Sequence, residues 1–92
     1  MADMKLSIII PVFNERSTIL EILKLIKGVN LGLEKEIIIV DDCSTDGTVD
    51  VLKGLNGNQY KIILKNKNEG KGAAIKTGLT QAQGEFVIFQ DA

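Results

Sequence analysis

The sequence predicts an α/β fold in which a parallel sheet of about four strands alternates with helices. Four short runs rich in β-branched and aromatic residues recur along the chain, and segments with apolar residues at helical spacing separate them. The run at residues 37–40, IIIV, is apolar at every position, which is typical of a strand covered on both faces. Strands that alternate with helices form βαβ units with right-handed crossovers, so the order βαβαβαβ is expected.

The first half of the chain contains two of these strands and one long helix. The first strand is expected at residues 5–12, KLSIIIPV, where Pro11 ends the ladder because it has no backbone donor. Ser17 or Thr18 is a suitable N-cap, and apolar residues at positions 19, 22, 23, 26 and 29 share one helical face. Lys27 and Gly28 fit the helix end. The second strand is the run at residues 37–40.

The second half repeats the alternation with shorter elements. A short helix is expected at residues 48–55, capped by Asp46 or a neighbouring hydroxyl, and a third strand at residues 60–64. The polar loop NKNEGKG, residues 66–72, leads into a helix that begins near Ala73, and the small residues of this helix would let it lie close to the sheet. The fourth strand, EFVIFQ at residues 85–90, is expected to place residues 86–89 in the core.

Length and composition exclude several classes of protein. The 92 residues fit one small domain, and a net charge of -1 with only four aromatic side chains disfavours a nucleic-acid partner. The chain has no histidine and one cysteine, Cys43, so neither a disulfide within the chain nor an imidazole base is expected. No stretch approaches the roughly 20 apolar residues of a membrane span, and the amino terminus does not fit a signal peptide. A cytoplasmic protein is therefore expected.

Acidic residues follow the predicted strands where the strands end. Asp41 and Asp42 come directly after residues 37–40, Glu15 follows the first strand, and Asp91 follows the fourth. Parallel strands point their carboxyl ends toward the same rim, and ligands of open α/β sheets bind at that rim. Solvated turn residues are the alternative interpretation of Asp41 and Asp42. Asp46 and the glycine after it fit a cap and a turn better than a ligand contact.

Common nucleotide-binding and metal-binding motifs are absent from the sequence. The first strand is followed by PVFNE, without the glycines of a dinucleotide fingerprint, and GKG at residues 70–72 lacks the spacing of a Walker loop. The stretch from Asp42 has Lys53 where a calcium loop needs a bidentate glutamate. A nicotinamide or flavin enzyme, a P-loop enzyme and an EF-hand are therefore disfavoured.

Four segments in order, SIIIPVFNE, EIIIVDDCSTDGT, NKNEGKGAAIKTGL and GEFVIFQDA, carry a resemblance that covers nearly the whole chain. The sequence resembles the amino-terminal, nucleotide-binding part of family 2 glycosyltransferases, which have the GT-A fold. It is especially similar to the polyprenyl- and dolichyl-phosphate mannosyl- and glucosyltransferases. The resemblance implies a nucleoside diphosphate sugar, UDP- or GDP-hexose, as donor, and a lipid phosphate as an acceptor of the hexose.

The resemblance also implies the residues of the site. Asp42 is implied to contact the nucleotide base, and Asp91 to bind Mg²⁺ or Mn²⁺ as the first carboxylate of an Asp-x-Asp motif, which is incomplete in these 92 residues. The catalytic base is expected beyond residue 92, so residues 1–92 are interpreted as one truncated nucleotide-sugar-binding domain that is inactive alone. The positions that match the donor pocket are Pro11, Phe13, Glu15, Val40, Asp42, Asp91 and Ala92.

Other functions stay open at this point. One is a catalytically inactive module that binds nucleotide or assembles with itself, and another is a metal-dependent phosphoryl-transfer domain. The latter usually has an acid cluster after its first strand, where this chain has PVFN. If no strand covers residues 86–89, their open edge predicts a homo-oligomer. The lipid acceptor predicts that the complete enzyme works peripherally at the cytosolic membrane face.

Overall fold

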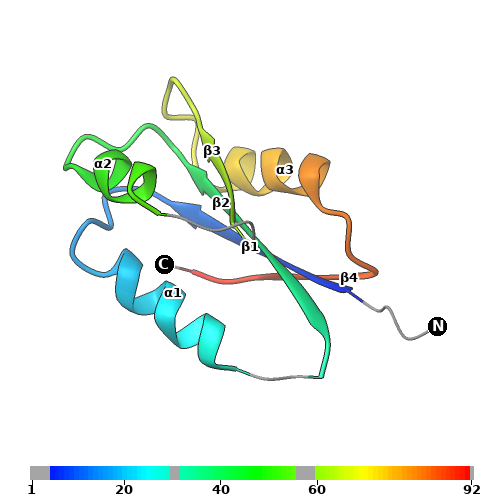
Figure 1. Cartoon of the computed structure of the whole chain (residues 1–92). Coiled ribbons are helices and arrows are strands. Elements are labelled where there is room, and N and C mark those ends of the chain that lie inside the picture. Colours follow the sequence, from blue (N-terminus) through cyan, green and yellow to red (C-terminus); the bar gives the residue numbers. More distant parts are fainter. Residues whose placement is uncertain (1–4, 30–31, 56–59, 92) are drawn as a thin grey trace.

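The computed structural model describes residues 5–29, 32–55 and 60–91, which form a parallel four-stranded sheet with helices on both faces (Figure 1). The spatial order of the strands is β3-β2-β1-β4, and every pairing is parallel. The predicted fold class is therefore confirmed. The elements are β1 (Lys5–Val12), α1 (Ile19–Gly28), β2 (Glu34–Asp41), α2 (Thr48–Lys53), β3 (Tyr60–Leu64), α3 (Lys71–Gln81) and β4 (Phe86–Phe89).

Several element boundaries differ from those expected, including both ends of β4, which is Phe86–Phe89 instead of residues 85–90. β2 begins at Glu34, ahead of its apolar run, because Lys5 and Leu6 of β1 offer backbone partners to Glu34 and Lys35. α2 ends at Lys53, and α3 begins at Lys71. In β2, backbone pairing with a long neighbouring strand thus extends the strand into polar sequence.

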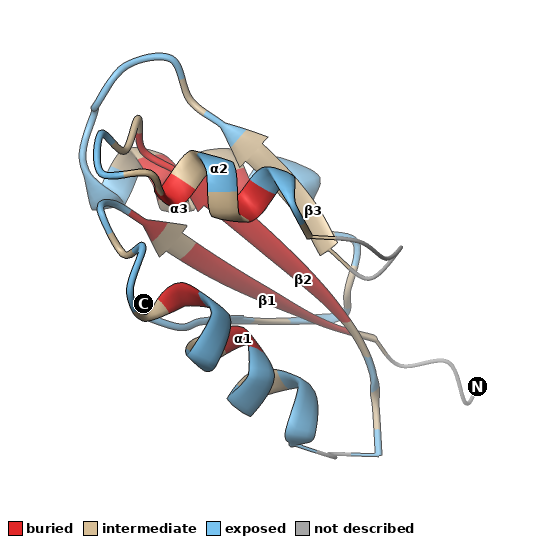
Figure 2. Cartoon of the chain, turned by 60° about the vertical axis from the view of Figure 1, so that its left-hand side comes forward, coloured by how far each residue is buried: buried red, intermediate tan, exposed pale blue. Residues whose placement is uncertain are grey.

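The core consists of two apolar layers, one on each face of the sheet. Alternate residues of β1 and β2 face α1 and α2, and the residues between them face α3. Figure 2 shows that burial is concentrated in these two central strands. The first layer contains Leu6, Ile8, Ile10, Val12, Ile19, Leu23, Ile37, Ile39 and Leu52, and the second contains Ile9, Ile38, Val40 and Ala74.

Helix α3 lies close against the sheet because its contact surface is made of small residues. Ala74 and Gly78 are its buried positions. A methyl group added at Gly78 would lie 2.6 Å from Cγ2 of Ile9, which is closer than real Cβ contacts allow. The expected close approach of this helix is therefore confirmed.

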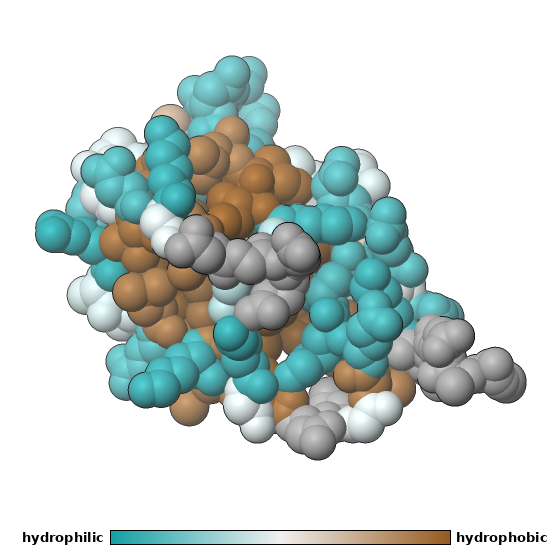
Figure 3. Space-filling model, in the orientation of Figure 1, coloured by the Kyte–Doolittle hydropathy of each residue, from teal (hydrophilic) through white to brown (hydrophobic). Residues whose placement is uncertain are grey.

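The expectation that residues 86–89 belong to the core is wrong for three of the four. Phe86, Ile88 and Phe89 are 47%, 44% and 54% exposed, and only Val87 packs against the α3-facing layer. The reason is topological, since β4 is an edge strand whose partner within the described ranges is β1. Around the other edge strand, β3, hydrophobic residues also reach the surface on the face shown in Figure 3.

Candidate functional site

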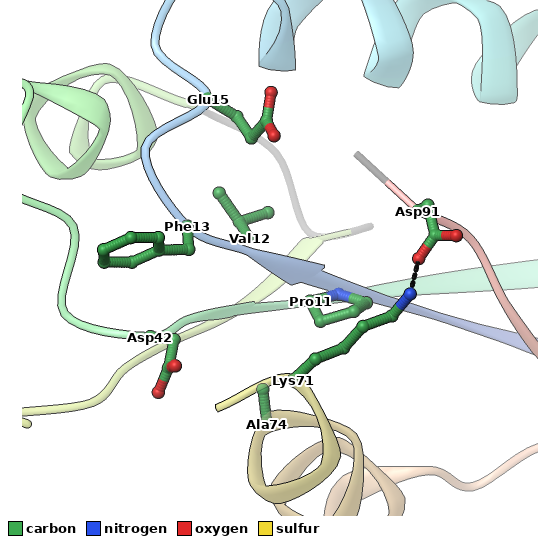
Figure 4. Close-up of a pocket in the computed structure, with 8 residues that line it drawn as sticks. All are labelled: Pro11, Val12, Phe13, Glu15, Asp42, Lys71, Ala74 and Asp91. Atoms are coloured by element: carbon green, nitrogen blue, oxygen red, sulfur yellow. Dashed lines mark ion pairs between the residues drawn. The ribbon is translucent and has the colours of Figure 1, made fainter. Parts of the chain in front are cut away.

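A pocket of about 300 Å³ opens at the carboxyl rim of the sheet, between the ends of β1 and β4 and the start of α3 (Figure 4). Five of the seven predicted site residues line it, together with three that the prediction did not include. Val40 lies instead in the fully buried layer that faces α3, and Ala92 lies outside the described residues. The lining residues are Pro11, Val12, Phe13, Glu15, Asp42, Lys71, Ala74 and Asp91.

The first wall of the pocket is the turn after β1, and side-chain contacts fix this turn to the turn after β2. The Asn14 backbone N–H donates to Oγ of Ser44 at 2.9 Å, and the Thr45 N–H donates to Oδ1 of Asn14 at 2.8 Å. The Glu15 N–H donates to Oγ1 of Thr48 at 3.0 Å. These contacts fix the backbone that presents Phe13 and Glu15 to the pocket.

Two acids of the second turn have structural partners outside the pocket. Asp41 is fully buried and accepts hydrogen bonds from the Ser44 backbone N–H at 2.9 Å and the Ser44 hydroxyl at 2.5 Å. Asp46 accepts hydrogen bonds from the hydroxyl of Thr48 and from the Thr48 backbone N–H at 3.0 Å. These bonds lower the pKa of Asp46, and the bond from the hydroxyl has the largest effect. The contacts agree with the interpretation of Asp46 as a turn residue, but the predicted cap is wrong, because the N-cap of α2 is Gly47 and it has no side-chain cap hydrogen bond.

Asp42 lines the pocket and also fixes the segment before α3, which forms the second wall of the pocket. Its carboxylate accepts the backbone N–H groups of Glu69 at 3.0 Å and Gly70 at 2.8 Å, with Nζ of Lys65 at 3.7 Å. Gly70 has φ +95°, a conformation that favours glycine, directly before α3 begins. A carboxylate has about four acceptor positions, so Asp42 keeps capacity for a ligand after these contacts.

Lys71 and Asp91 form an ion pair across the mouth of the pocket, marked by the dashed line in Figure 4. Lys71 comes from the start of α3 and Asp91 from the end of β4, and their side chains are 61% and 74% exposed. Lys71 is the only cation among the lining residues, whereas Glu15, Asp42 and Asp91 are acids. The pocket is therefore acidic, with one positive charge at its entrance.

The residues at this entrance fit a divalent cation that shares its coordination with a ligand. Among the residues that the structure describes, no group of three or more carboxylate, thiol or imidazole side chains could hold a metal. Asp91 nevertheless offers one exposed carboxylate, and the Lys71 ammonium already occupies the place of a cation beside it. Mg²⁺ in particular is held by one or two carboxylates, with water and phosphate oxygens as its other ligands.

A parallel sheet with a polar pocket at its carboxyl rim defines a ligand-binding α/β domain. Residues 7–92 match the family model described as Glycosyl transferase family 2, so the chain belongs to this family. The family assignment predicted from the four sequence segments is confirmed.

Two similar curated proteins have names that specify lipid-phosphate transferases. The chain is 36% identical over 90 residues to the dolichol-phosphate mannosyltransferase of Pyrococcus furiosus, covering 97% of the chain and 26% of that protein. It is 34% identical over 101 residues to the undecaprenyl-phosphate 4-deoxy-4-formamido-L-arabinose transferase of Edwardsiella ictaluri, covering 100% of the chain and 31% of that protein. The chain thus spans between a quarter and a third of these relatives.

Solved structures of glycosyltransferases share the fold. The mannosyltransferase PcManGT from Pyrobaculum calidifontis, in complex with GDP-Man and Mn²⁺, superposes with a TM-score of 0.83 at 28% identity, over 94% of this chain and 26% of that one. S. aureus TarS in complex with UDP-GlcNAc gives a TM-score of 0.81 at 37% identity, over 96% and 26%. The predicted architecture, a parallel α/β sheet that matches the GT-A fold, is confirmed.

Proposed function

We propose that residues 1–92 form the nucleotide-sugar-binding domain of a longer family 2 glycosyltransferase. In the complete enzyme, the activity is transfer of a hexose from UDP or GDP to an acceptor such as a polyprenyl phosphate. The proposal rests on one observation above all, the convergence of Glu15, Asp42 and Asp91 on a single rim pocket. The names of the similar proteins, and the small share of their length that the chain spans, support it.

The pocket offers a separate group to each part of the donor. Asp42 has acceptor capacity for N–H or hydroxyl groups of the base and ribose, and the 44% exposed ring of Phe13, with Pro11, offers an apolar surface. The Lys71 ammonium suits the negatively charged diphosphate. Val40 and Ala92 stay predictions from the family resemblance, since Val40 is not a lining residue and Ala92 lies outside the described residues.

The cofactor proposed for Asp91 is Mg²⁺ or Mn²⁺. Carboxylate and phosphate oxygens are hard ligands that both ions accept. When bound, the cation neutralises the negative charge that develops on the departing nucleoside diphosphate. Asp91 would hold the cation, and Lys71, no longer paired with Asp91, would be free to hold the diphosphate.

Catalysis by the 92 residues alone is not part of the proposal, because the base that activates the acceptor is expected beyond residue 92. Binding of donor without turnover is the expected behaviour of this chain. A metal-dependent phosphoryl-transfer domain is the weaker candidate. It would need a cluster of acids at the end of β1, where the pocket wall is Pro11, Val12 and Phe13 and the acid that follows is Glu15 alone.

A lipid-phosphate acceptor would bring the complete enzyme to a membrane surface. We propose that it works at the cytoplasmic face as a peripheral protein. None of the helices in residues 5–29, 32–55 and 60–91 is long and apolar enough to cross a bilayer. Self-association through the open sheet edge at β4 is a separate proposal about the same chain.

Titration of UDP and GDP into the chain by calorimetry, with and without Mn²⁺, tests the donor site. We expect Mn²⁺-dependent binding of one nucleotide, weakened roughly tenfold or more in Asp91→Asn because the cation loses its protein ligand. Asp50→Asn makes the same charge change at an exposed site on α2 and is expected to bind as the parent does. Equal affinities of all three chains would contradict the role of Asp91, and absence of any nucleotide binding would contradict the proposed function.

A further inference from the structure

Lys65 lies directly after β3 and connects two acids beside the pocket. Its side chain is only 10% exposed, with Nζ 2.8 Å from Oε1 of Glu69 and 3.7 Å from Oδ1 of Asp42. An ammonium group with so little access to water needs carboxylate partners, and these two acids supply them. Asp42 lines the pocket and Lys65 does not, so an effect of Lys65 on a ligand has to act through its partners.

The backbone of Lys65 is fixed by the sheet. Its N–H donates to the C=O of Asp41 at 2.9 Å, at the end of the parallel pairing between β2 and β3. Asp41 is fully buried and directly precedes Asp42. The Lys65 side chain therefore starts from an ordered part of the sheet, next to the strand end that carries Asp42.

The loop at residues 66–70 is attached to the same lysine and the same acid. The backbone N–H groups of Glu69 and Gly70 donate to the Asp42 carboxylate at 3.0 and 2.8 Å. The Glu69 carboxylate pairs with Lys65, so Asp42, Glu69 and Lys65 form a closed cycle of contacts. Because Gly70 directly precedes α3, this cycle fixes the point at which α3 begins.

Charge explains why the cycle needs a lysine. The hydrogen bond from Lys65 has the largest effect on Glu69 and lowers its pKa, so Glu69 is ionised at neutral pH. Without Lys65, two carboxylates that now share one ammonium group would repel each other. The loop would then be attached to Asp42 by its two backbone hydrogen bonds alone.

We propose that Lys65 is a positioning residue of the donor site. By holding Glu69 against Asp42, Lys65 orders the loop and the start of α3 before a nucleotide binds. A nucleotide that had to order residues 66–70 as it binds would lose affinity, because the entropy of that step opposes binding. The inference rests on the proposed function, since nucleotide affinity is what this order improves.

Lys67 offers a comparison within the same loop. Its Nζ lies 3.7 Å from Oε2 of Glu69, but its side chain is 75% exposed. Ion pairs between side chains in solvent contribute little. Lys67 is therefore the matched control, because its removal takes a positive neighbour from Glu69 but leaves the contacts of Lys65 in place.

Amide hydrogen exchange of the nucleotide-free chain tests the order of the loop. In Lys65→Met, which keeps an unbranched side chain, the Glu69 and Gly70 amides should exchange roughly tenfold faster than in the parent. The amides of β2 should keep their protection, and Lys67→Met should match the parent throughout. Unchanged exchange at Glu69 and Gly70 would overturn the positioning role. Loss of protection across the whole sheet would overturn it too, because Lys65 would then support the fold in general.

Glu69→Gln breaks the same ion pair from its other side, at a side chain that is 42% exposed. We expect it to speed exchange at Gly70 as Lys65→Met does, without the removal of a nearly buried group. Lys65→Arg keeps the positive charge and should restore most of the protection. Exchange in Lys65→Arg as fast as in Lys65→Met would contradict a role that depends on charge.

Calorimetric titration with the nucleotide that the parent binds, in the presence of Mn²⁺, tests the consequence for the donor. Lys65→Met and Glu69→Gln should bind roughly tenfold more weakly than the parent, and Lys67→Met should bind as the parent does. Saturating nucleotide should return the Gly70 amide of Lys65→Met to the protection of the parent. Equal affinities of the parent and Lys65→Met would overturn the role of Lys65 and leave the donor site in place. Absence of nucleotide binding by the parent would overturn the proposed function and this inference with it.

Discussion

The carboxylate of Asp42 accepts two backbone N–H groups from the segment before α3, and the residue is only 4% exposed. The position of Lys71 and Ala74 at the pocket depends on this contact, because Gly70 directly precedes α3, which carries both residues. Asp42 is thus predicted to contact the ligand, and it also positions the side of the pocket that α3 forms.

Asp42→Asn is expected to lower the free energy of unfolding by about 1–3 kcal/mol, because an amide NH₂ in place of one oxygen faces a backbone donor. Urea denaturation of the nucleotide-free chain measures this effect. Asp50→Asn, on the exposed side of α2, serves as control and is expected to change the stability by less than about 0.5 kcal/mol. Equal midpoints for the parent and Asp42→Asn would show that the two hydrogen bonds do not hold the α3 wall.

The residues of the pocket were predictable where they follow a strand directly. Phe13, Asp42 and Asp91 stand at visible ends of apolar runs, and topology alone brings such positions to one rim. The position of Lys71 depends on the path of the loop before α3, which contacts between residues distant in sequence determine. Val40 is buried because it belongs to the apolar layer that faces α3. The apolar run of its own strand does not reveal that layer.

Among the elements, α3 can lie close to the sheet because the residues on its contact surface are small. Gly78 lies directly over Ile9 of β1, and Ala74 is fully buried beside it. The helix would be more stable in isolation with alanine at both glycine positions, 72 and 78. Packing against the sheet overrides that preference at Gly78 but not at Gly72, where an added methyl group meets nothing within 4 Å.

Gly78→Ala and Gly72→Ala are therefore expected to change stability in opposite directions. Gly78→Ala should destabilise the fold by about 1–3 kcal/mol, because the new methyl group overlaps Ile9 and forces α3 away from the sheet. Gly72→Ala should stabilise it by up to about 1 kcal/mol through helix propensity. Thermal unfolding of both variants measures the difference, and stabilisation by both would show that α3 does not lie against β1 as closely as described.

The elements that the sequence predicted best are those whose boundaries coincide with changes of polarity. The ranges expected for the first and third strands are those of β1 and β3. β2 extends further than its apolar run, because pairing with β1 uses backbone groups that every residue has. Exposure of β4 depends on what lies beyond its outer edge, and its own apolar side chains do not carry that information.

In the molecule as a whole, the two rims of the sheet carry different features. The carboxyl rim holds the pocket, and the opposite rim holds a buried acid, Glu36, that connects distant segments. One oxygen of Glu36 accepts the hydroxyl of Ser7 at 2.5 Å and the N–H of Gln83 at 2.6 Å, and the other pairs with Nζ of Lys61 at 3.1 Å. Strands β1, β2 and β3 and the connection from α3 to β4 thus meet at one carboxylate.

The contacts of Glu36 predict how acid affects the stability of the molecule. Burial alone would raise the pKa of Glu36, but the hydrogen bonds from Ser7, Gln83 and Lys61 outweigh it and lower the pKa from 4.5 to about 2. The unfolded chain therefore binds the proton more tightly than the folded chain. Glu36 contributes about 3 kcal/mol of stability above its unfolded pKa, and this contribution is lost as the pH falls from about 4.5 toward 2.

Glu36→Gln is expected to remove this acid-dependent part of the stability. Urea denaturation from neutral pH down to about pH 2 should show a parent whose free energy of unfolding falls more steeply than that of the variant, with the gap between them closing in acid. Glu34→Gln removes an exposed carboxylate whose side chain is 69% accessible, and its pH profile should follow that of the parent. Profiles of the parent and Glu36→Gln that stay parallel throughout would contradict a lowered pKa at Glu36, because only a group that binds its proton differently in the two states changes the slope.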